Sequence, residues 1–475
     1  MKKNAYITAS WLTTGVALIL LNTTAFAADP AVAASSTASK PAAASNGLLN
    51  DWLDKQYPAL QPWDFGGQVR FRYEVFDNAS PAYPNRDFQR NGAANDNRYL
   101  WTRERIHLGY NTPWLSVYGE GQNSDSTGDH DTRNPGRDPF DLYQAFVILG
   151  NAKEFPLTAK VGRQELIYGD ERLIGASDWS NTGRSFDAAK LRYENKSFWV
   201  DAFVSRVVLI DPNEYDESDH HDWFSGVYAS STKLIPVQES QFYVLSRNSG
   251  AGAAVSPRDI YSIGGRVKSL PGKLKGWDYF GEIVGQFGSV SQSGVRRTQQ
   301  AFAVAAGGGY TWQKVVASPR LGIEYDYATG DSDPKDGKSD TLGNLFPTNH
   351  KHYGLMDVMG WRNIHDLRFS LGLKPCKKLS VSLDQHLFWL ANTHDYFYPQ
   401  SGSGRTGNGY GLNASYDSYV GSEFDLEANY ALTAWPNFRA GYGHFWTGGY
   451  VDSSKSGVGG ATGSDWIYVQ ALVKF

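Results

Sequence analysis

The sequence predicts an all-β protein, a transmembrane antiparallel β-barrel of the outer-membrane type with about 18 strands. Three observations lead to this fold class. Apolar and charged residues alternate with a period of two along most of the chain. Short and long connections between the predicted strands alternate strictly, and the last predicted strand ends in an aromatic residue, Phe475.

The first 27 residues have the features of a secretory signal peptide. Lys2 and Lys3 precede a short apolar run, and Ala25-Phe26-Ala27 fits a cleavage site. The run is too short to form a membrane-spanning helix. Because residues 1–27 contain two lysines and no acidic residue, their removal changes the formal net charge from -4 to -6.

Residues 28–64 are expected to form a flexible periplasmic segment. Residues 28–46 are rich in Ala, Ser and Pro, which is typical of a linker. Residues 47–62 fit either a short amphipathic helix or a disordered lead-in. The barrel is then expected to occupy residues 65–475.

Composition supports export and a β-rich fold. The chain has 475 residues, of which 14% are aromatic and 50 are glycine, and its one cysteine, Cys376, cannot form an internal disulfide. No second long apolar run is present that would predict a transmembrane helix. Barrel strands are apolar on one face only, which fits a mean hydropathy of -0.45.

The alternation begins near Gln68. Val69, Phe71, Tyr73 and Val75 fall on one face of a predicted strand, and Arg70, Arg72 and Glu74 on the other. The pattern recurs in segments 103–110, 190–193, 261–268, 320–326, 367–371, 379–386 and 423–428. One face is apolar and the other charged, which fits a barrel with an apolar outer face or a soluble β-sandwich with an apolar inner face.

The connections favour the barrel. About eight short turns alternate with about nine long loops, which gives about eighteen strands and places both termini on the periplasmic, short-turn side. A sandwich has no reason to gather its long loops at one end. The long loops are expected at roughly 77–98, 123–139, 165–184, 206–222, 247–258, 289–298, 328–363, 392–419 and 447–464.

Segment 160–193 interrupts the alternation with four glycines and charges of both signs. Such a loop suits either a solvated surface or a water-filled cavity. We interpret residues 165–184 as an infolded loop that narrows a pore, with sharp bends permitted by glycine.

Two parts of the sequence are similar to the alginate-export outer-membrane family. They are GRQELIYGDERLIG with DWSNTGRSFDAAKL in segment 162–191, and GSEFDLEANYALTAWPNFRAGYGHFWTGGYV from Gly421. The resemblance spans about residues 66–475 and implies an eighteen-stranded barrel whose arginine-lined, loop-gated pore passes an anionic polysaccharide. Where the family pattern continues Gly-Arg-Gln with arginine, this chain has Glu165.

Guanidinium groups bind carboxylates in a bidentate way and remain charged, so arginines on the lumen face are candidates for contact with an anionic saccharide. The alternative is that they pair with acidic residues as structural ladders across strands. Arg70 and Arg72 share the lumen parity. The candidate pore-lining residues are Arg163, Arg192, Arg320, Arg368, Arg103, Arg105, Arg266, Arg439, Glu165, Asp170, Arg172, Asp187, Lys190 and Glu324.

No catalytic motif is found, so an enzyme is not expected. His220 and His221 are adjacent and would face opposite sides of a strand. No cofactor is expected, although Asp331, Asp333, Asp336 and Asp340 in loop 328–363 leave calcium binding open. An outer-membrane enzyme and a plugged adhesin barrel are the alternatives to a channel.

The expected partners follow from this fold and from the resemblance. They are an anionic polysaccharide or oligosaccharide, outer-membrane lipid, the barrel-assembly machinery, which would read the terminal Phe475, and periplasmic export proteins. A small anion or organic acid is the alternative solute. We expect a monomer in the outer membrane that binds no nucleic acid.

Overall fold

The computed structural model describes residues 47–78, 96–129, 136–405, 410, 412–454 and 460–475. The predicted signal peptide and linker up to residue 46 lie outside these residues and stay predictions. A short helix, α1 (Leu48–Gln56), and a 3-10 turn, η1 (Pro58–Leu60), precede the first strand. The helical alternative for residues 47–62 is therefore confirmed.

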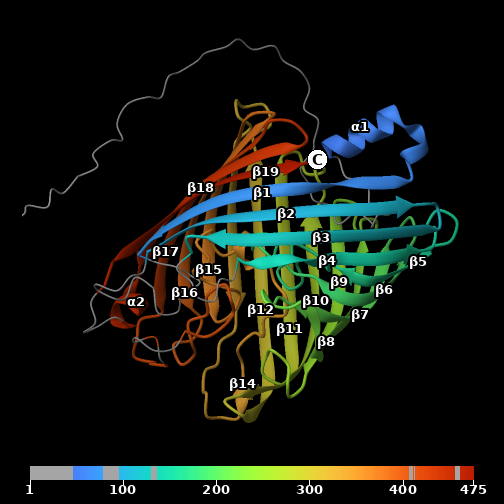
Figure 1. Cartoon of the computed structure of the whole chain (residues 1–475). Coiled ribbons are helices and arrows are strands. Elements are labelled where there is room, and N and C mark those ends of the chain that lie inside the picture. The colour runs from blue at the N-terminus through green and yellow to red at the C-terminus, as the bar shows by residue number, and fades with distance from the viewer. Residues whose placement is uncertain (1–46, 79–95, 130–135, 406–409, 411, 455–459) are drawn as a thin grey trace, which may run out of the picture. The chain divides into compact units, whose positions relative to one another are not determined.

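A closed antiparallel barrel follows, as expected (Figure 1). Nineteen strands are described; β14 is a two-residue strand within a loop, which leaves eighteen in the barrel wall. The strands are β1 (Trp63–Asp77), β2 (Asn97–Asn111), β3 (Leu115–Thr127), β4 (Asp138–Leu149), β5 (Leu157–Gln164), β6 (Phe186–Glu194), β7 (Trp199–Leu209), β8 (Glu217–Ser231), β9 (Gln238–Ser249), β10 (Arg258–Ser269), β11 (Trp277–Gln292), β12 (Val295–Thr311), β13 (Arg320–Ala328), β14 (Lys338–Ser339), β15 (Ile364–Cys376), β16 (Leu379–Leu390), β17 (Tyr419–Ala431), β18 (Pro436–Thr447) and β19 (Gly463–Lys474).

The first and last strands close the barrel. β1 pairs with both β2 and β19, and Val75 lies opposite Ile467 in the β1–β19 register. Gly67 and Phe475 exchange two backbone hydrogen bonds of 3.0 Å, so the last residue completes the ladder. With these bonds the wall has no open edge, which a membrane-spanning sheet requires.

The period-two pattern separates the two faces of the wall. On β1, the apolar side chains Phe71 and Tyr73 are 49% and 42% exposed, whereas Arg70 and Arg72 are 2% and 0% exposed. Apolar residues therefore face outward, toward lipid, and the charged residues face the interior, as in an outer-membrane barrel. None of the helices in the described part of the chain could span a membrane.

Short turns and long loops lie at opposite ends of the barrel. Figure 1 shows β14 and α2 (Gly449–Ser454), both parts of long loops, at the end opposite α1 and the C-terminus. The 3-10 turn η2 (Asn349–Lys351) also lies in a long loop.

The prediction of a long loop at residues 289–298 is wrong. β11 and β12 are the longest strands described, with 16 and 17 residues, and only residues 293 and 294 connect them. Ser293 and Gly294 have φ angles of 49° and 78°, which close a tight hairpin. The polar residues that suggested a loop lie instead on strand ends, because backbone pairing in a hairpin does not require apolar side chains.

Candidate functional site

The loop between β5 and β6, residues 165–185, lies inside the barrel, and we call it the first inward loop. The Tyr168 hydroxyl donates to Asp201 on β7 at 2.8 Å. Arg172 Nη1 donates to Asp326 on β13, also at 2.8 Å. Because β13 is far from β5 around the closed wall, the loop must cross the lumen, and the predicted inward fold is confirmed.

A second long loop, residues 329–363, meets it there; we call it the second inward loop. Three backbone bonds join the two loops: Phe346 N–H to Leu173 O, Gly175 N–H to Phe346 O and Thr348 N–H to Glu171 O, at 2.8–2.9 Å. A Cβ at Gly175 would lie 2.2 Å from Thr348 Oγ1, so the close approach requires glycine there. The two loops therefore form one hydrogen-bonded unit within the barrel.

Apolar residues of both loops stabilise this unit. Leu166 and Ile174 of the first loop and Phe346 of the second are at most 5% exposed, and Phe346 contacts Phe186 and Phe224 of the wall edge-on at centroid distances of 5.0 Å. Burial of these side chains fixes the loop positions and leaves the polar segments to face the charged wall.

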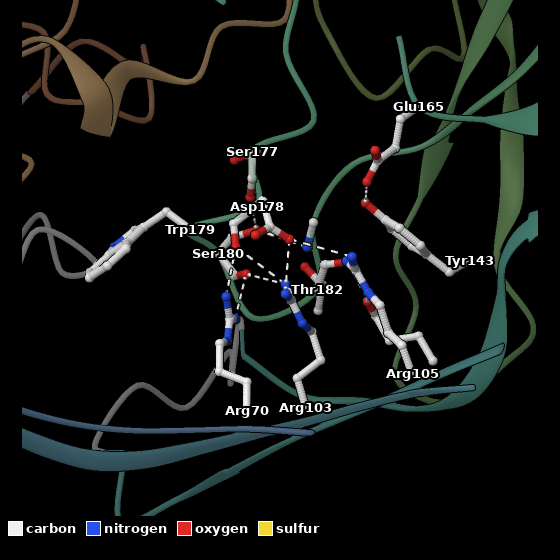
Figure 2. Close-up of polar contacts among 12 residues, drawn as sticks. Arg70, Arg103, Arg105, Tyr143, Glu165, Ser177, Asp178, Trp179, Ser180 and Thr182 are labelled. Atoms are coloured by element: carbon white, nitrogen blue, oxygen red, sulfur yellow. Dashed lines mark hydrogen bonds and ion pairs between the residues drawn. The ribbon is translucent and has the colours of Figure 1, made fainter. Parts of the chain in front are cut away.

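Arg70, Arg103 and Arg105, which we call the arginine cluster, face the first inward loop from β1 and β2 (Figure 2). Arg70 lies directly opposite Arg103 in the register. Like charges opposed across strands destabilise a sheet unless other groups compensate them. The cluster therefore requires oxygen atoms from elsewhere.

The first inward loop supplies those oxygens. Arg70 donates to the carbonyl oxygens of Asp178 and Ser180 at 2.7 and 2.9 Å. Arg103 and Arg105 lie 2.9 and 3.4 Å from the Asp178 carboxylate. Figure 2 shows the three guanidinium groups directed at the segment 177–182 of this loop. When the first inward loop docks against the wall, its oxygen atoms therefore also compensate the positive charges of the arginine cluster.

Asp178 is the carboxylate at the centre of this contact. Burial alone would raise its pKa, but Arg103, Arg105 and Arg70 lower it to about 2. Its side chain is nevertheless 63% accessible, and it lines the cavity between the inward loops and the wall. The group is therefore charged at neutral pH and open to a solute.

The cluster retains free hydrogen-bonding capacity. Within the described part of the chain, Arg70 Nε, Arg103 Nε and Arg105 Nη2 are buried without a hydrogen-bond partner. Arg70 has oxygen partners but forms no ion pair with any described carboxylate. Buried donors without partners are rare in folded proteins, so these three N–H groups are an unusual feature of the cluster.

Arg184, at the end of the first inward loop, is a second cation held by backbone. It donates to the carbonyl oxygens of Gly175 and Pro347 at 2.9 and 3.0 Å. Burial and the charge of Arg247 lower its pKa to about 10, so it stays protonated at neutral pH.

Glu165 lies beside the arginine cluster and has a raised pKa. Burial raises its pKa above the ordinary value, despite Arg105 and a 2.6 Å hydrogen bond from the Tyr143 hydroxyl. Figure 2 shows this pair beside Arg105. A carboxyl group with a raised pKa is protonated, and so loses its negative charge, at a higher pH than a solvated carboxyl group does.

Arg172 fixes the opposite side of the first inward loop. It pairs with Glu324 and with Asp326 at 2.8 Å, and it donates to the Tyr353 hydroxyl of the second inward loop at 2.9 Å. Burial lowers its pKa, but Asp326, Tyr353 and Glu324 raise it well above the ordinary value. Arg172 therefore joins both inward loops to β13.

Most other predicted pore residues are paired with acidic residues. One of these pairs, Arg163 with Asp187, lies on the face of β5 and β6 opposite to that of the buried Phe186 and Ala188, so by alternation it points away from the lumen. Arg192 and Lys190 share Asp201, with Arg192 bidentate at 2.5 and 2.8 Å. The remaining pairs are Arg163–Asp187, Arg266–Asp170, Arg320–Asp278, Arg368–Glu324 and Arg439–Glu427. Pairing with acidic residues was the alternative that the sequence left open, and it describes these residues, although the partner of Arg266 belongs to the first inward loop and not to a strand. Whether they also contact a solute stays a prediction.

Trp179 and His350 were not selected from the sequence. The indole of Trp179 lies between the Arg72 guanidinium at 3.7 Å and the His350 ring at 3.8 Å. Trp179 therefore bridges the wall and the second inward loop. Nothing in the spacing of these residues indicates the stack, because His350 is 171 positions away.

A cavity of about 760 Å³ lies between the inward loops and the wall. Trp179 and His350 line it together with charged residues of both signs. The charged lining residues are Arg70, Arg105, Lys351, Arg439 and Lys474, with Glu120, Glu165, Glu171, Asp178, Asp384 and Glu427. The positive field is therefore local to the arginine cluster and does not extend over the whole cavity.

Known structures share the fold at low identity. OccK9 (OpdG) of Pseudomonas aeruginosa aligns with a TM-score of 0.57 and 11% identity, over 87% of this chain and 98% of that one. OccK2 (OpdF) of the same organism, solved in complex with glucuronate, aligns at 0.55 and 11% over the same shares. OccAB4 of Acinetobacter baumannii aligns at 0.54 and 10%, over 86% and 98%. A comparison with curated proteins found no match.

A family model for alginate export matches residues 61–462. This range contains the inward loops and all but the end of the barrel wall. Together with the closed eighteen-stranded wall, the match makes the protein an outer-membrane channel. The chain belongs to the alginate export family of outer-membrane β-barrels.

Proposed function

We propose that the channel passes anionic saccharides bearing uronate carboxylates through a constriction formed by the inward loops and the arginine cluster. The observation that carries the proposal is the cluster itself. Arg103 and Arg105 share one accessible carboxylate, Asp178, and Arg70 is held by carbonyl oxygens of the same segment. All three keep buried N–H groups without partners among the described residues. A solute carboxylate can occupy that position with bidentate geometry.

Passage requires contact that is favourable but brief. Asp178 and the loop carbonyl oxygens already satisfy much of the cluster, so an entering carboxylate exchanges with them and does not meet bare cations. The acidic residues of the cavity lining then weaken retention. Glucuronate bound to OccK2, which shares the fold, fits a barrel of this type accommodating a uronate.

The predicted arginines outside the cluster have a smaller role in this proposal. Arg163, Arg320 and Arg368, which we call the paired set, each lie against a carboxylate of the wall. Their charge is largely offset at short range, and an approaching anion would have to displace a fixed partner. We assign anion preference first to the arginine cluster and only second to the paired set.

A channel for small organic anions is the alternative. The packed inward loops favour it, because they fill much of the lumen and a polymer needs a continuous passage. The two functions differ in how block depends on the length of a uronate oligomer. A polymer channel is blocked increasingly by longer oligomers, whereas block of a small-anion channel does not change beyond the first few sugar units.

Planar-bilayer recording tests the proposal. Uronate oligomers should block the open current reversibly, and neutral oligosaccharides of equal length should not. A wild-type channel that prefers cations and ignores uronates would reject it.

We also infer that both termini lie on the periplasmic side, since α1, near the start of the described residues, and the C-terminus lie at the short-turn end of the wall. The barrel is closed without a second copy, which supports a monomer. The ladder between Phe475 and Gly67 supports a role for the terminal residue in assembly.

A further inference from the structure

Three aspartates from separate parts of the chain meet at the long-loop end of the wall. Asp138 and Asp141 begin β4, and Asp216 directly precedes β8. One carboxylate oxygen from each lies within 4.8 Å of the others, and all three residues are buried. Among the described residues this is the one such group of acidic, histidine or cysteine side chains.

Local hydrogen bonds hold two of the three in place. The Asp216 N–H donates to Asp141 Oδ2 at 2.6 Å, and the Asp211 N–H donates to Asp216 Oδ1 at 2.9 Å. The contact between Asp141 and Asp216 links β4 to the β7–β8 loop. Backbone N–H groups therefore hold the carboxylates of Asp141 and Asp216 in place despite their mutual repulsion.

Asp138 has no such partner. It is only 2% exposed, yet within the described ranges its carboxylate accepts no hydrogen bond and forms no ion pair. Arg163 is the nearby cation, but its guanidinium is bound to Asp187 at 2.9 and 3.2 Å. A buried carboxylate that faces two others is costly unless a cation or a proton compensates it.

We propose that Asp138, Asp141 and Asp216 bind a calcium ion. Three carboxylates supply the hard oxygen ligands that calcium prefers, and calcium accepts mixed and irregular coordination more readily than magnesium does. The sequence offered calcium binding elsewhere, at Asp331 and its neighbours. There the backbone N–H groups of Asp333 and Lys338 satisfy Asp331 and Asp336, which is typical of turns.

A calcium ion at this position would join two connections on the outer side of the first inward loop. Asp138 follows the β3–β4 connection, and Asp216 ends the β7–β8 connection. These flank β5 and β6, which carry the first inward loop. The ion would therefore stabilise the frame of that loop without contacting the solute path.

The test uses the purified full-length protein in lipopolysaccharide-free detergent, stripped with a chelator. Terbium, which occupies calcium sites, is added and its luminescence is excited through the aromatic side chains; Tyr215 is adjacent to a proposed ligand. Calcium should displace it at one equivalent per chain. Asp138→Asn should raise the half-saturating concentration at least ~10-fold, and Asp340→Asn, in the second inward loop, should leave it unchanged.

Each outcome decides the proposal. Loss of terbium binding in Asp138→Asn and Asp216→Asn supports the site, provided that both variants keep the heat-dependent gel migration of the folded wild-type barrel. Unchanged binding in Asp138→Asn, or loss only in Asp340→Asn, overturns it. Metal analysis of the wild-type protein after dialysis against calcium needs no variant, and less than stoichiometric calcium there overturns it as well.

Discussion

Replacing Arg172 by glutamine should release the first inward loop from the far wall. Arg172 is 2% exposed at its side chain and pairs with Glu324 and Asp326, which are 6% and 1% exposed. Glu324 keeps Arg368 as a partner in the variant. Asp326 forms no other ion pair among the described residues, so it would be left as a buried, uncompensated charge.

The size of the effect follows from that charge. Removing one partner of a buried ion pair costs about 3–5 kcal/mol. If this cost falls on the docked loop only, the ratio of undocked to docked loop rises between about 160-fold and 5,000-fold, at about 1.36 kcal/mol for each factor of ten. The arginine cluster still holds the other side, so we expect brief openings and not a permanently open channel.

Single-channel recording in planar bilayers measures this ratio as the fraction of time spent in high-conductance states. Arg172→Gln combined with Asp326→Asn removes the stranded charge and should recover most of the wild-type behaviour. Arg320→Gln breaks a half-exposed pair with Asp278 that does not contact the loop, and it should change gating little. Wild-type traces from a folded Arg172→Gln channel would refute the reasoning.

Three further predictions concern charge and assembly. The pKa of Glu165 is raised in the folded state, so its contribution to stability is complete below its unfolded pKa and is lost as the pH rises through its folded pKa. Glu165→Gln should therefore raise the heat-modification temperature more at pH 8 than at pH 4. Equal shifts at the two pH values would contradict this. Asp178→Asn should shift the reversal potential toward anions more than Asp187→Asn, whose arginine partner does not line the cavity; equal shifts would place the selectivity elsewhere. Deleting Phe475 should reduce the folded fraction in outer membranes, as judged by gel migration, and normal assembly would remove its proposed role.

The wall of the barrel could be predicted from the sequence because each strand carries its own signal. The alternation of Arg70, Phe71, Arg72 and Tyr73 identifies both faces of β1 without reference to any neighbour. The hairpin at Ser293 was missed because strand ends outside the apolar belt lose that signal and resemble loops.

The site could be predicted only in part. Parity placed the strand arginines on the lumen side, except Arg163, which shares the outward parity of Val161 and was expected where β5 gives way to the inward loop. Pairing, however, depends on the register between strands, which periodicity does not give. Arg192 meets Asp201 because β6 and β7 align these residues, whereas Arg70 faces Arg103 and depends on the distant Asp178. The meeting of Asp138 with Asp216 likewise requires the closed fold.

The most direct test of the central claim compares two triple variants by their reversal potential in a salt gradient and their block by uronate oligomers. One replaces the arginine cluster by glutamine, and the other replaces the paired set. We predict that the first loses uronate block and shifts toward cations, whereas the second retains block and shifts less. Retained block in the first variant, together with its loss in the second, would contradict the assignment of anion recognition to the cluster.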